Sequence, residues 1–121
     1  MKKILVVDDE RPVCDMLKKF LTMKGYEAIV AYGSEEALIK MKEEKPDAVL
    51  LDIIMPDMDG IRTLEKMREV DPKIVIVMIT AVKDPEAGRR CIELGAKDYI
   101  TKPFSLSYLE RVLEAKLADL L

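Results

Sequence analysis

Four short segments of this 121-residue chain are each followed by polar side chains of the kinds that handle phosphate and divalent cations. In chain order these side chains are Asp8, Asp9 and Glu10, then Asp52, then Thr80, then Lys102. Carboxylates gathered in one place repel one another unless a cation neutralises them. Oxygen ligands alone favour Mg²⁺, with Mn²⁺ as the alternative, in a site that keeps several waters and is often shared with a phosphate. Lys102 and Thr80 would add a positive charge and a hydroxyl donor for phosphoryl oxygens beside Asp52.

The segments that must position these side chains are short and mostly β-branched, and they alternate with helical patterns along the whole chain. Such an alternation predicts an α/β fold with a mostly parallel sheet and helices on both faces. The predicted strands are residues 4–7, 28–31, 48–51, 74–79 and 98–101. The third and fourth are almost continuously apolar, which is typical of strands near the centre of a sheet.

Five helices are predicted between and after these strands. Pro12 and Gly25 mark the start and the end of the first, Ser34 opens the second, and the third ends at Asp71 before a proline. The fourth, over residues 85–94, contains Gly88 and is expected to be the most labile. Ser105 caps a fifth helix with apolar positions at Leu106, Leu109, Leu113, Leu117 and Leu120. Met16, Met41, Met67 and Met78 are predicted to lie in the core.

The strand order decides whether the polar side chains meet. Ligands of an open parallel sheet bind outside the carboxyl ends of the strands, at the point where the strand order reverses. With the order 2-1-3-4-5 the first and third strands are neighbours, so Asp8 and Asp9 would lie beside Asp52. A single acid at a strand end is often only a helix cap or a solvated loop residue. The joint pattern, with Thr80 and Lys102, is what predicts a site for Mg²⁺-dependent phosphoryl chemistry.

Composition narrows the class of protein. With 20 basic and 23 acidic residues the net charge is -3, which gives no electrostatic basis for nucleic-acid binding. No apolar stretch approaches the roughly 20 residues of a membrane span, and no signal peptide is visible, so we expect a cytoplasmic protein without a membrane partner. Cys14 and Cys91 are widely spaced, and we expect them to be reduced, buried thiols. The lack of histidine removes zinc-binding imidazoles and phosphohistidine chemistry within this chain.

Four motifs, in the order ILVVDDE, LLDIIMPDMDG, MITA and GAKDYITKPF, resemble those of the receiver domains of two-component response regulators. The resemblance covers essentially the whole chain. It implies one receiver domain over residues 1–121 with a flavodoxin-like, doubly wound (βα)5 three-layer sandwich. Such a domain is a signalling switch that catalyses only its own phosphorylation and slow dephosphorylation. Its partners would be a sensor histidine kinase or phosphotransfer domain and a downstream output domain or target protein.

The resemblance assigns roles around the phosphoacceptor. Asp52 resembles the nucleophile that takes the phosphoryl group from a phosphohistidine. Asp9, often with Asp8 through water, resembles the metal-binding pair, and the backbone carbonyl of Ile54 resembles a further ligand beside Asp52. Lys102 resembles the lysine that pairs with the phosphorylated site.

The resemblance also assigns a switch and an output face. Thr80 and Tyr99 resemble the coupled pair in which a hydroxyl moves toward the phosphoryl group and an aromatic ring follows. The Lys102-Pro103 bond resembles a cis peptide, which an X-Pro bond tolerates. The signal is expected to leave through the fourth helix, the fifth strand and the fifth helix.

Departures from the family pattern fall at positions that tune the switch. Ile54 and Val82 are apolar where the family varies and where side chains govern the access of water to the phosphoryl group. Lys97 replaces an acid that is frequent before Asp98 in receivers that dimerise through the last two helices. A phosphorylation-dependent homodimer of that kind is therefore in doubt.

Three other classes of protein fit the sequence less well. A haloacid dehalogenase phosphatase needs a nucleophile and an acid two residues apart after its first strand, together with a cap insertion. Here the adjacent pair Asp8-Asp9 follows the first strand, and no cap insertion is visible. A nucleotide-binding domain lacks both of its glycine-rich signatures in this sequence. A degenerate receiver that binds partners without phosphorylation is disfavoured by the intact acids and Lys102. The cognate kinase, and whether the domain acts alone or within a longer regulator, are left open.

Overall fold

The computed structural model describes residues 1–118 and contains one parallel sheet of five strands in the order β2-β1-β3-β4-β5. The strands are β1 (Lys3–Val7), β2 (Glu27–Ala31), β3 (Ala48–Leu51), β4 (Val75–Thr80) and β5 (Asp98–Thr101). The predicted order is confirmed, and every predicted strand is present within one residue at each end. The two most apolar strands, β3 and β4, lie inside the sheet as predicted, because both of their faces are covered by helices.

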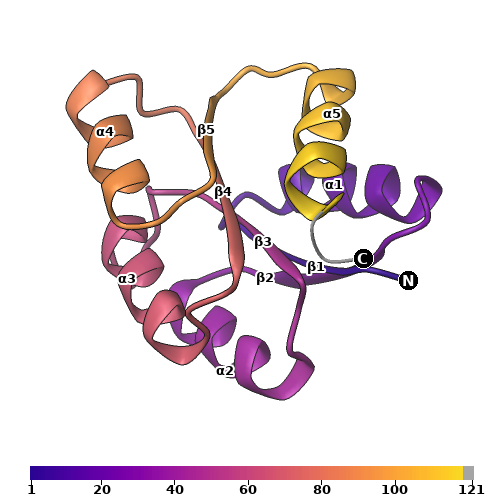
Figure 1. The fold of residues 1–121 in the computed structure, drawn as a ribbon, viewed down its shortest axis with the longest axis horizontal. Coiled ribbons are helices and arrows are strands. Elements are labelled where there is room, and N and C mark those ends of the chain that lie inside the picture. The colour runs from indigo at the N-terminus through magenta and orange to yellow at the C-terminus, as the bar shows by residue number, and fades with distance from the viewer. Residues whose placement is uncertain (119–121) are drawn as a thin grey trace.

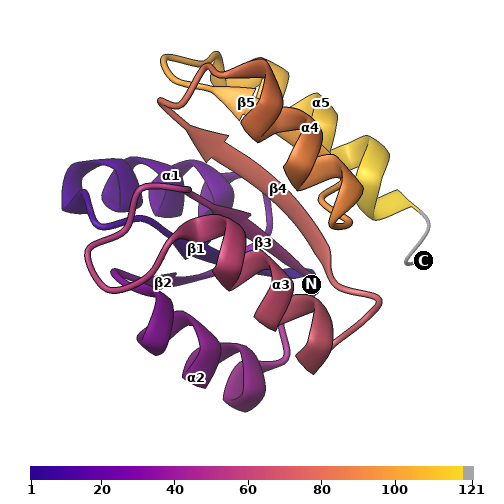
Figure 2. The ribbon, with the colours of Figure 1, turned by 90° about the vertical axis from the view of Figure 1, so that its left-hand side faces the viewer.

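Five helices cover the two faces of this sheet (Figure 1). They are α1 (Arg11–Met23), α2 (Ser34–Glu44), α3 (Gly60–Val70), α4 (Pro85–Glu93) and α5 (Leu106–Leu117). Figures 1 and 2 show α1 and α5 on one face and α2, α3 and α4 on the other. The predicted doubly wound (βα)5 three-layer sandwich is therefore confirmed.

Two apolar clusters hold the layers together, because alternate residues of each strand point to opposite faces. Toward α1 and α5 the buried side chains include Ile4, Val6, Leu50, Val77, Leu17, Leu21, Leu109 and Leu113. Toward α2, α3 and α4 they include Leu5, Val7, Leu51, Met78, Met41, Leu64, Met67 and Cys91. Both cysteines are free and buried, as predicted. Burial raises the pKa of each thiol to about 11, so both are held as neutral, unreactive groups.

Most predicted helix boundaries are confirmed, and one prediction of a core residue is wrong. Pro12 lies in the first turn of α1, Gly25 follows its end with a φ of +92°, and Ser105 caps α5 by accepting the Tyr108 N–H. α2 begins at Ser34, as predicted, and Gly33 is its N-cap. Met16, predicted as core, is 41% exposed on α1.

Two further predictions concern the C-terminal residues of the chain and the absence of a membrane span. Leu120, the last apolar position predicted for α5, lies outside the described residues. Within residues 1–118, no helix has the length and apolar character that crossing a bilayer would require.

Candidate functional site

The carboxyl ends of β1 and β3 bring two buried aspartates together. The two strands pair in register, with Val7 opposite Leu51, so the next residue of each strand, Asp8 and Asp52, emerges at the same edge. Backbone hydrogen bonds extend the pairing past the strands, because the Asp52 N–H donates to the Val7 oxygen at 3.1 Å. Asp8 is 3% exposed and Asp52 is 4% exposed. The switch point of the sheet therefore holds two carboxylates with little access to water.

Lys102 is the cation that joins these acids. Its Nζ lies 2.8 Å from Asp8 Oδ2, 3.0 Å from Asp52 Oδ2 and 3.2 Å from Glu10 Oε1. The backbone N–H of Lys102 donates to the Thr80 oxygen at 2.8 Å, which ties the end of β5 to the end of β4. The Lys102-Pro103 peptide bond is cis. One ammonium thus faces three carboxylates contributed by two distant segments.

The loop after β3 orients the Asp52 carboxylate from its other side. Ile54 N–H donates to Asp52 Oδ1 at 3.2 Å, while Oδ2 is held by Lys102. The loop returns close to its start, where the Gly60 N–H donates to the Ile53 oxygen at 2.7 Å. A Cβ at Gly60 would lie only 2.1 Å from the Asp52 carbonyl oxygen, so this close approach requires glycine. The nucleophile predicted from the sequence is therefore fixed at both oxygens.

The charge balance of the site is negative. Burial raises the pKa of Asp8 above its ordinary value, and the charge of Asp52 raises it further, against the lowering effect of Lys102. Burial alone would lower the pKa of Lys102, but its hydrogen bonds to Asp8 and Asp52 outweigh burial and raise it. Lys102 is therefore firmly charged, and one positive charge does not fully compensate three acids.

The donor set fits a hard divalent cation. Asp8, Glu10 and Asp52 each offer one carboxylate oxygen, and these atoms lie within 4.8 Å of one another. Oxygen donors and a net negative charge suit Mg²⁺ better than the softer metals. Asp9, expected from the resemblance to bind the metal, is exposed and stands outside this group.

Glu10 is the member of the group to which sequence reasoning assigned no role. The spacing of the acids could have indicated its role, because side chains two residues apart in an extended chain point to the same side. Asp8 and Glu10 have that spacing, and the Glu10 N–H donates to Asp8 Oδ1 at 2.9 Å.

Replacing Asp8 by Asn is expected to raise the melting temperature in EDTA by about 3–6 °C, equivalent to about 1 kcal/mol, because it removes one uncompensated buried charge. Differential scanning calorimetry with and without Mg²⁺ checks this. Mg²⁺ should raise the melting temperature of the wild type and have much less effect on Asp8→Asn.

The gain in stability from Asp8→Asn is expected to depend on pH. The pKa of Asp8 is higher in the folded chain than in the unfolded one. Its stabilising contribution is therefore fully present below its ordinary pKa and is lost as the pH rises through the raised, folded value. The advantage of Asp8→Asn should shrink as the pH falls toward 4. A constant difference from pH 7 to pH 4 would contradict the charge argument.

Thr80 and Tyr99 are linked through the backbone of the loop after β4. Thr80 is fully buried, and its Oγ1 accepts the Val82 N–H at 3.3 Å. The Val82 carbonyl in turn accepts the Tyr99 hydroxyl at 2.6 Å. The Tyr99 ring lies against α4, where a Cβ at Gly88 would be 3.7 Å from it. A continuous path of contacts therefore connects the Thr80 hydroxyl, at the end of β4, to the inner side of α4.

This chain matches a known protein family and a known relative over most of its length. The family model of the response regulator receiver domain matches residues 4–114. The alkaline phosphatase synthesis transcriptional regulatory protein PhoP of Bacillus subtilis is 47% identical over 105 residues, which are 86% of this chain and 43% of PhoP. This chain therefore spans less than half the length of that relative.

Two solved structures show the same fold over nearly the whole chain. A CheY-like receiver domain protein of Methanospirillum hungatei JF-1 has a TM-score of 0.95 and 34% identity, covering 98% of this chain and 95% of that one. A chain of the CheX-CheY-BeF3-Mg²⁺ complex of Borrelia burgdorferi has a TM-score of 0.90 and 33% identity, covering 94% and 87%. On the family match over residues 4–114, this chain belongs to the response regulator receiver domain family.

Proposed function

We propose that Asp52 accepts a phosphoryl group from the phosphohistidine of a sensor histidine kinase or phosphotransfer domain. The observation that carries this proposal is the geometry of the Asp52 carboxylate, which is buried and held by Lys102 at 3.0 Å and by the Ile54 N–H at 3.2 Å. A carboxylate that is buried beside two other acids and one lysine has no evident purpose in packing. It is well placed as a nucleophile whose product is stabilised by neighbouring donors.

Mg²⁺ is proposed as the cofactor, with Mn²⁺ as a substitute. Asp8, Asp52 and Glu10 would hold it, together with the Ile54 carbonyl and Asp9 that the family pattern implies. When bound, the ion neutralises charge on the phosphoryl oxygens. The relative from Borrelia burgdorferi was crystallised with BeF3 and Mg²⁺, which supports the same pairing of anion and cation here.

The residues of this chain carry out the transfer by position and charge. A carboxylate oxygen of Asp52 forms the new P–O bond while the P–N bond of the donor breaks, and the electron pair leaves with the histidine nitrogen. Lys102 can exchange a carboxylate partner for a phosphoryl oxygen without losing its charge, since its pKa is raised. The Thr80 hydroxyl supplies a further donor from β4.

The proposal is tested by incubating the protein with a phosphorylated histidine kinase, or with acetyl phosphate, in Mg²⁺. One phosphoryl group on Asp52 is the expected result. Failure of the wild-type chain to accept phosphate from either donor would overturn the assignment. Slow self-catalysed loss of the group is also expected, and no separate substrate is proposed.

The lifetime of the phosphoryl group is expected to depend on Ile54 and Val82. Ile54 is 57% exposed beside Asp52, and Val82 is half-buried in the loop after Thr80. Apolar side chains there hinder an approaching water and do not orient it. Ile54→Asn and Val82→Gln should each shorten the lifetime on the order of tenfold, less than a fully positioned general base achieves.

The lifetime can be followed by ³¹P NMR after the donor is removed. Val70→Gln is a matched control, because Val70 is an apolar residue 40% exposed at the far end of α3. Unchanged lifetimes in both loop variants would rule out gating by these side chains.

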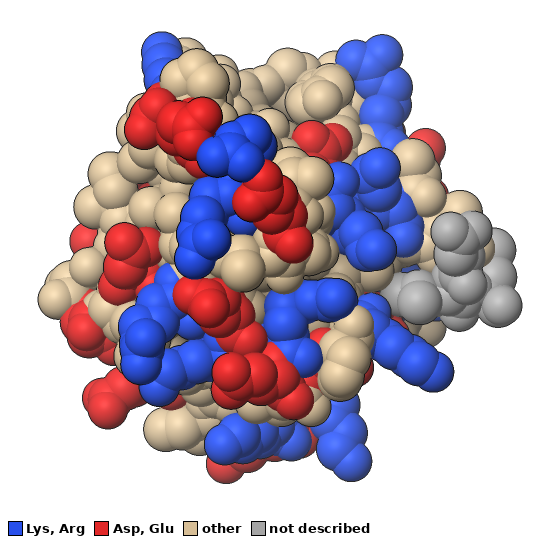
Figure 3. Space-filling view, turned by 60° about the vertical axis from the view of Figure 1, so that its left-hand side comes forward, with Lys and Arg blue, Asp and Glu red and all other residues tan. Residues whose placement is uncertain are grey.

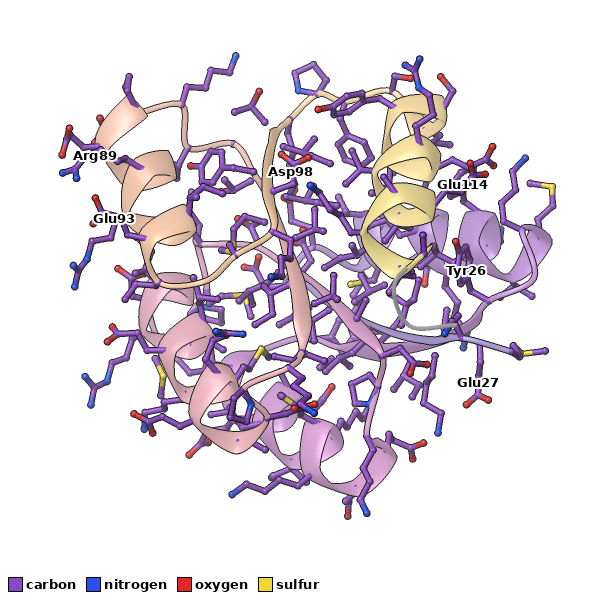
Figure 4. All side chains as sticks on the ribbon, viewed as in Figure 1. Tyr26, Glu27, Arg89, Glu93, Asp98 and Glu114 are labelled. Carbon is purple, nitrogen blue, oxygen red and sulfur yellow. The ribbon has the colours of Figure 1, made fainter. Side chains whose placement is uncertain are left out.

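The output is proposed to leave through the face formed by α4, β5 and α5. Figure 4 shows Arg89 and Glu93 on the outer side of α4 and Asp98 on β5. Arg89 bonds Glu86 at 2.7 Å and also pairs with Glu93, so these charges are satisfied within one helix. Lys97 is exposed next to Asp98. This pairing, with Lys97 in place of an acid, disfavours a dimer built on salt bridges across this face.

The wider setting follows from the family. Receiver domains of this family work with histidine kinases and output domains, and we propose the same partners in the cytoplasm for this chain. The surface over α3 and α4 intersperses basic and acidic side chains (Figure 3). A mixed surface and a net charge of -3 favour protein partners over direct contact with nucleic acid.

A further inference from the structure

Asp57, in the loop that follows Asp52, caps a helix to which it does not belong. The N-cap of α2 is Gly33, which has no side chain to satisfy the first N–H groups of that helix. Asp57 supplies the acceptors instead. Its Oδ1 accepts the Ser34 N–H at 3.0 Å and its Oδ2 accepts the Glu35 N–H at 3.0 Å. One carboxylate thus clamps the loop to the start of α2.

A buried polar contact continues this clamp. Ser34 Oγ lies 2.7 Å from Thr63 Oγ1, and Thr63 Oγ1 donates to the Asp59 carbonyl at 3.1 Å. Ser34 and Thr63 are both fully buried. Buried hydroxyls of this kind are costly to leave without partners, so the contact between α2 and α3 has one favoured arrangement.

The fit around the Asp57 carboxylate is close. A Cβ at Gly33 would lie 3.3 Å from both Asp57 oxygens, tight enough to displace them. Gly33 has an extended backbone with φ of −162°, which any residue can adopt. Glycine is therefore favoured at this position because it leaves room for the Asp57 carboxylate, and not because of its backbone conformation.

The clamped loop also carries Ile54, whose N–H holds Asp52 Oδ1. The loop is fixed at its start by this bond, near its middle by Asp57 on α2, and at its end by Gly60 on Ile53. Removing the middle attachment would leave the Ile53–Ile54 peptide with its two own bonds, of 3.2 Å to Asp52 and 2.7 Å from Gly60. The residues between Ile54 and Gly60 would lose the Asp57 bonds to α2.

We infer that Asp57 is a positioning residue: by anchoring the loop on α2, it fixes Ile54 and thereby the Asp52 carboxylate and the carbonyl offered to Mg²⁺. This inference rests on the proposed function for its catalytic consequence, although the positioning of Ile54 can be tested without it. The competing explanation is that Asp57 only caps α2.

The test compares Asp57→Ala with Asp47→Ala. Asp47 is a matched control, because its carboxylate also accepts a backbone N–H from another element, that of Lys3 at 2.8 Å. It follows α2 and precedes β3, at the opposite end of the strand from Asp52. Asp57→Ala should raise the Mg²⁺ dissociation constant by about tenfold, the low end for residues that support metal ligands. Asp47→Ala should change it less than twofold.

Two further variants test whether the acceptor oxygens of Asp57 carry the effect on Mg²⁺ binding. Asp57→Asn keeps one acceptor oxygen and should restore most of the Mg²⁺ affinity. Gly33→Ala leaves the carboxylate present and presses on it, so it should weaken Mg²⁺ binding in the same direction as Asp57→Ala. Isothermal titration gives the Mg²⁺ affinity, and ¹⁵N-resolved NMR without metal gives the amide positions of Ile54, Ser34 and Glu35.

The outcomes distinguish this inference from the proposed function. A displaced Ile54 amide in Asp57→Ala, with weaker Mg²⁺ binding than in Asp47→Ala, supports the inference. An Ile54 amide that stays in place, or equal Mg²⁺ affinities in the two variants, overturns it. If the wild-type chain bound Mg²⁺ but accepted no phosphate, the proposed function would fail while the NMR and titration results would still judge the role of Asp57.

Discussion

Acetyl phosphate with Mg²⁺ is expected to place one phosphoryl group on the wild-type chain and none on Asp52→Asn. The variant keeps the shape of the side chain but lacks the carboxylate that must form the P–O bond. In the wild type the Asp52 carboxylate is buried and held at both oxygens, by the Ile54 N–H and by Lys102. Intact-protein mass spectrometry after a timed reaction measures the effect, which should be complete loss.

Two controls accompany this result. Asp47→Asn alters an aspartate at the opposite end of β3 and should be phosphorylated like the wild type. EDTA should prevent phosphorylation of both. Label mapped to a serine or threonine, or undiminished labelling of Asp52→Asn, would contradict the nucleophile assignment.

Thr80→Ala is expected to accept phosphate at Asp52 but to lose the response of residues from about Asp84 to Tyr108. The Thr80 hydroxyl accepts the Val82 N–H, and the Val82 carbonyl holds the Tyr99 hydroxyl, so this is the path that connects the site with α4 and β5. Without the hydroxyl, the phosphoryl group makes no differential contact with the two states of that face. Amide chemical shifts before and after phosphorylation measure the loss.

Thr80→Ser is the matched control, since it retains the hydroxyl and loses only a methyl group. Its amide shifts on phosphorylation should resemble those of the wild type. Shifts of full size in Thr80→Ala would show that the signal leaves by another route.

Much of the fold follows from local patterns in the sequence. The apolar runs that became β3 and β4 predicted interior strands, because a strand covered on both faces is apolar throughout. Pro12 and Ser105 predicted helix starts, because their effects lie within one helical turn. Placing Asp8 beside Asp52 required only the strand order and the rule that ligands gather at carboxyl ends.

What could not be predicted depends on contacts between distant segments. Ser34 is of a residue type that often caps helices. Here, however, Asp57 accepts the first N–H groups of α2, and the Ser34 side chain turns inward to Thr63. Met16 follows the apolar repeat of α1, but it lies at the margin of the buried stripe and is exposed. The role of Asp57 has no local signal at all, since its partners are 23 and 22 residues away along the chain.

The hydrogen bonds of Lys102 to Asp8 and Asp52 span 94 and 50 residues, so the site is completed by the last strand of the sheet. During synthesis at about 5–20 residues per second, Lys102 is added about 3 to 10 seconds after Asp52. In that interval the nascent chain contains the acids but lacks their counter-charge. On the proposed function, a kinase would therefore meet a competent acceptor only in copies whose β5 has been made and has joined the sheet. Phosphorylation would thus be limited to finished molecules, and unfinished chains would neither consume phosphoryl groups nor send a premature signal.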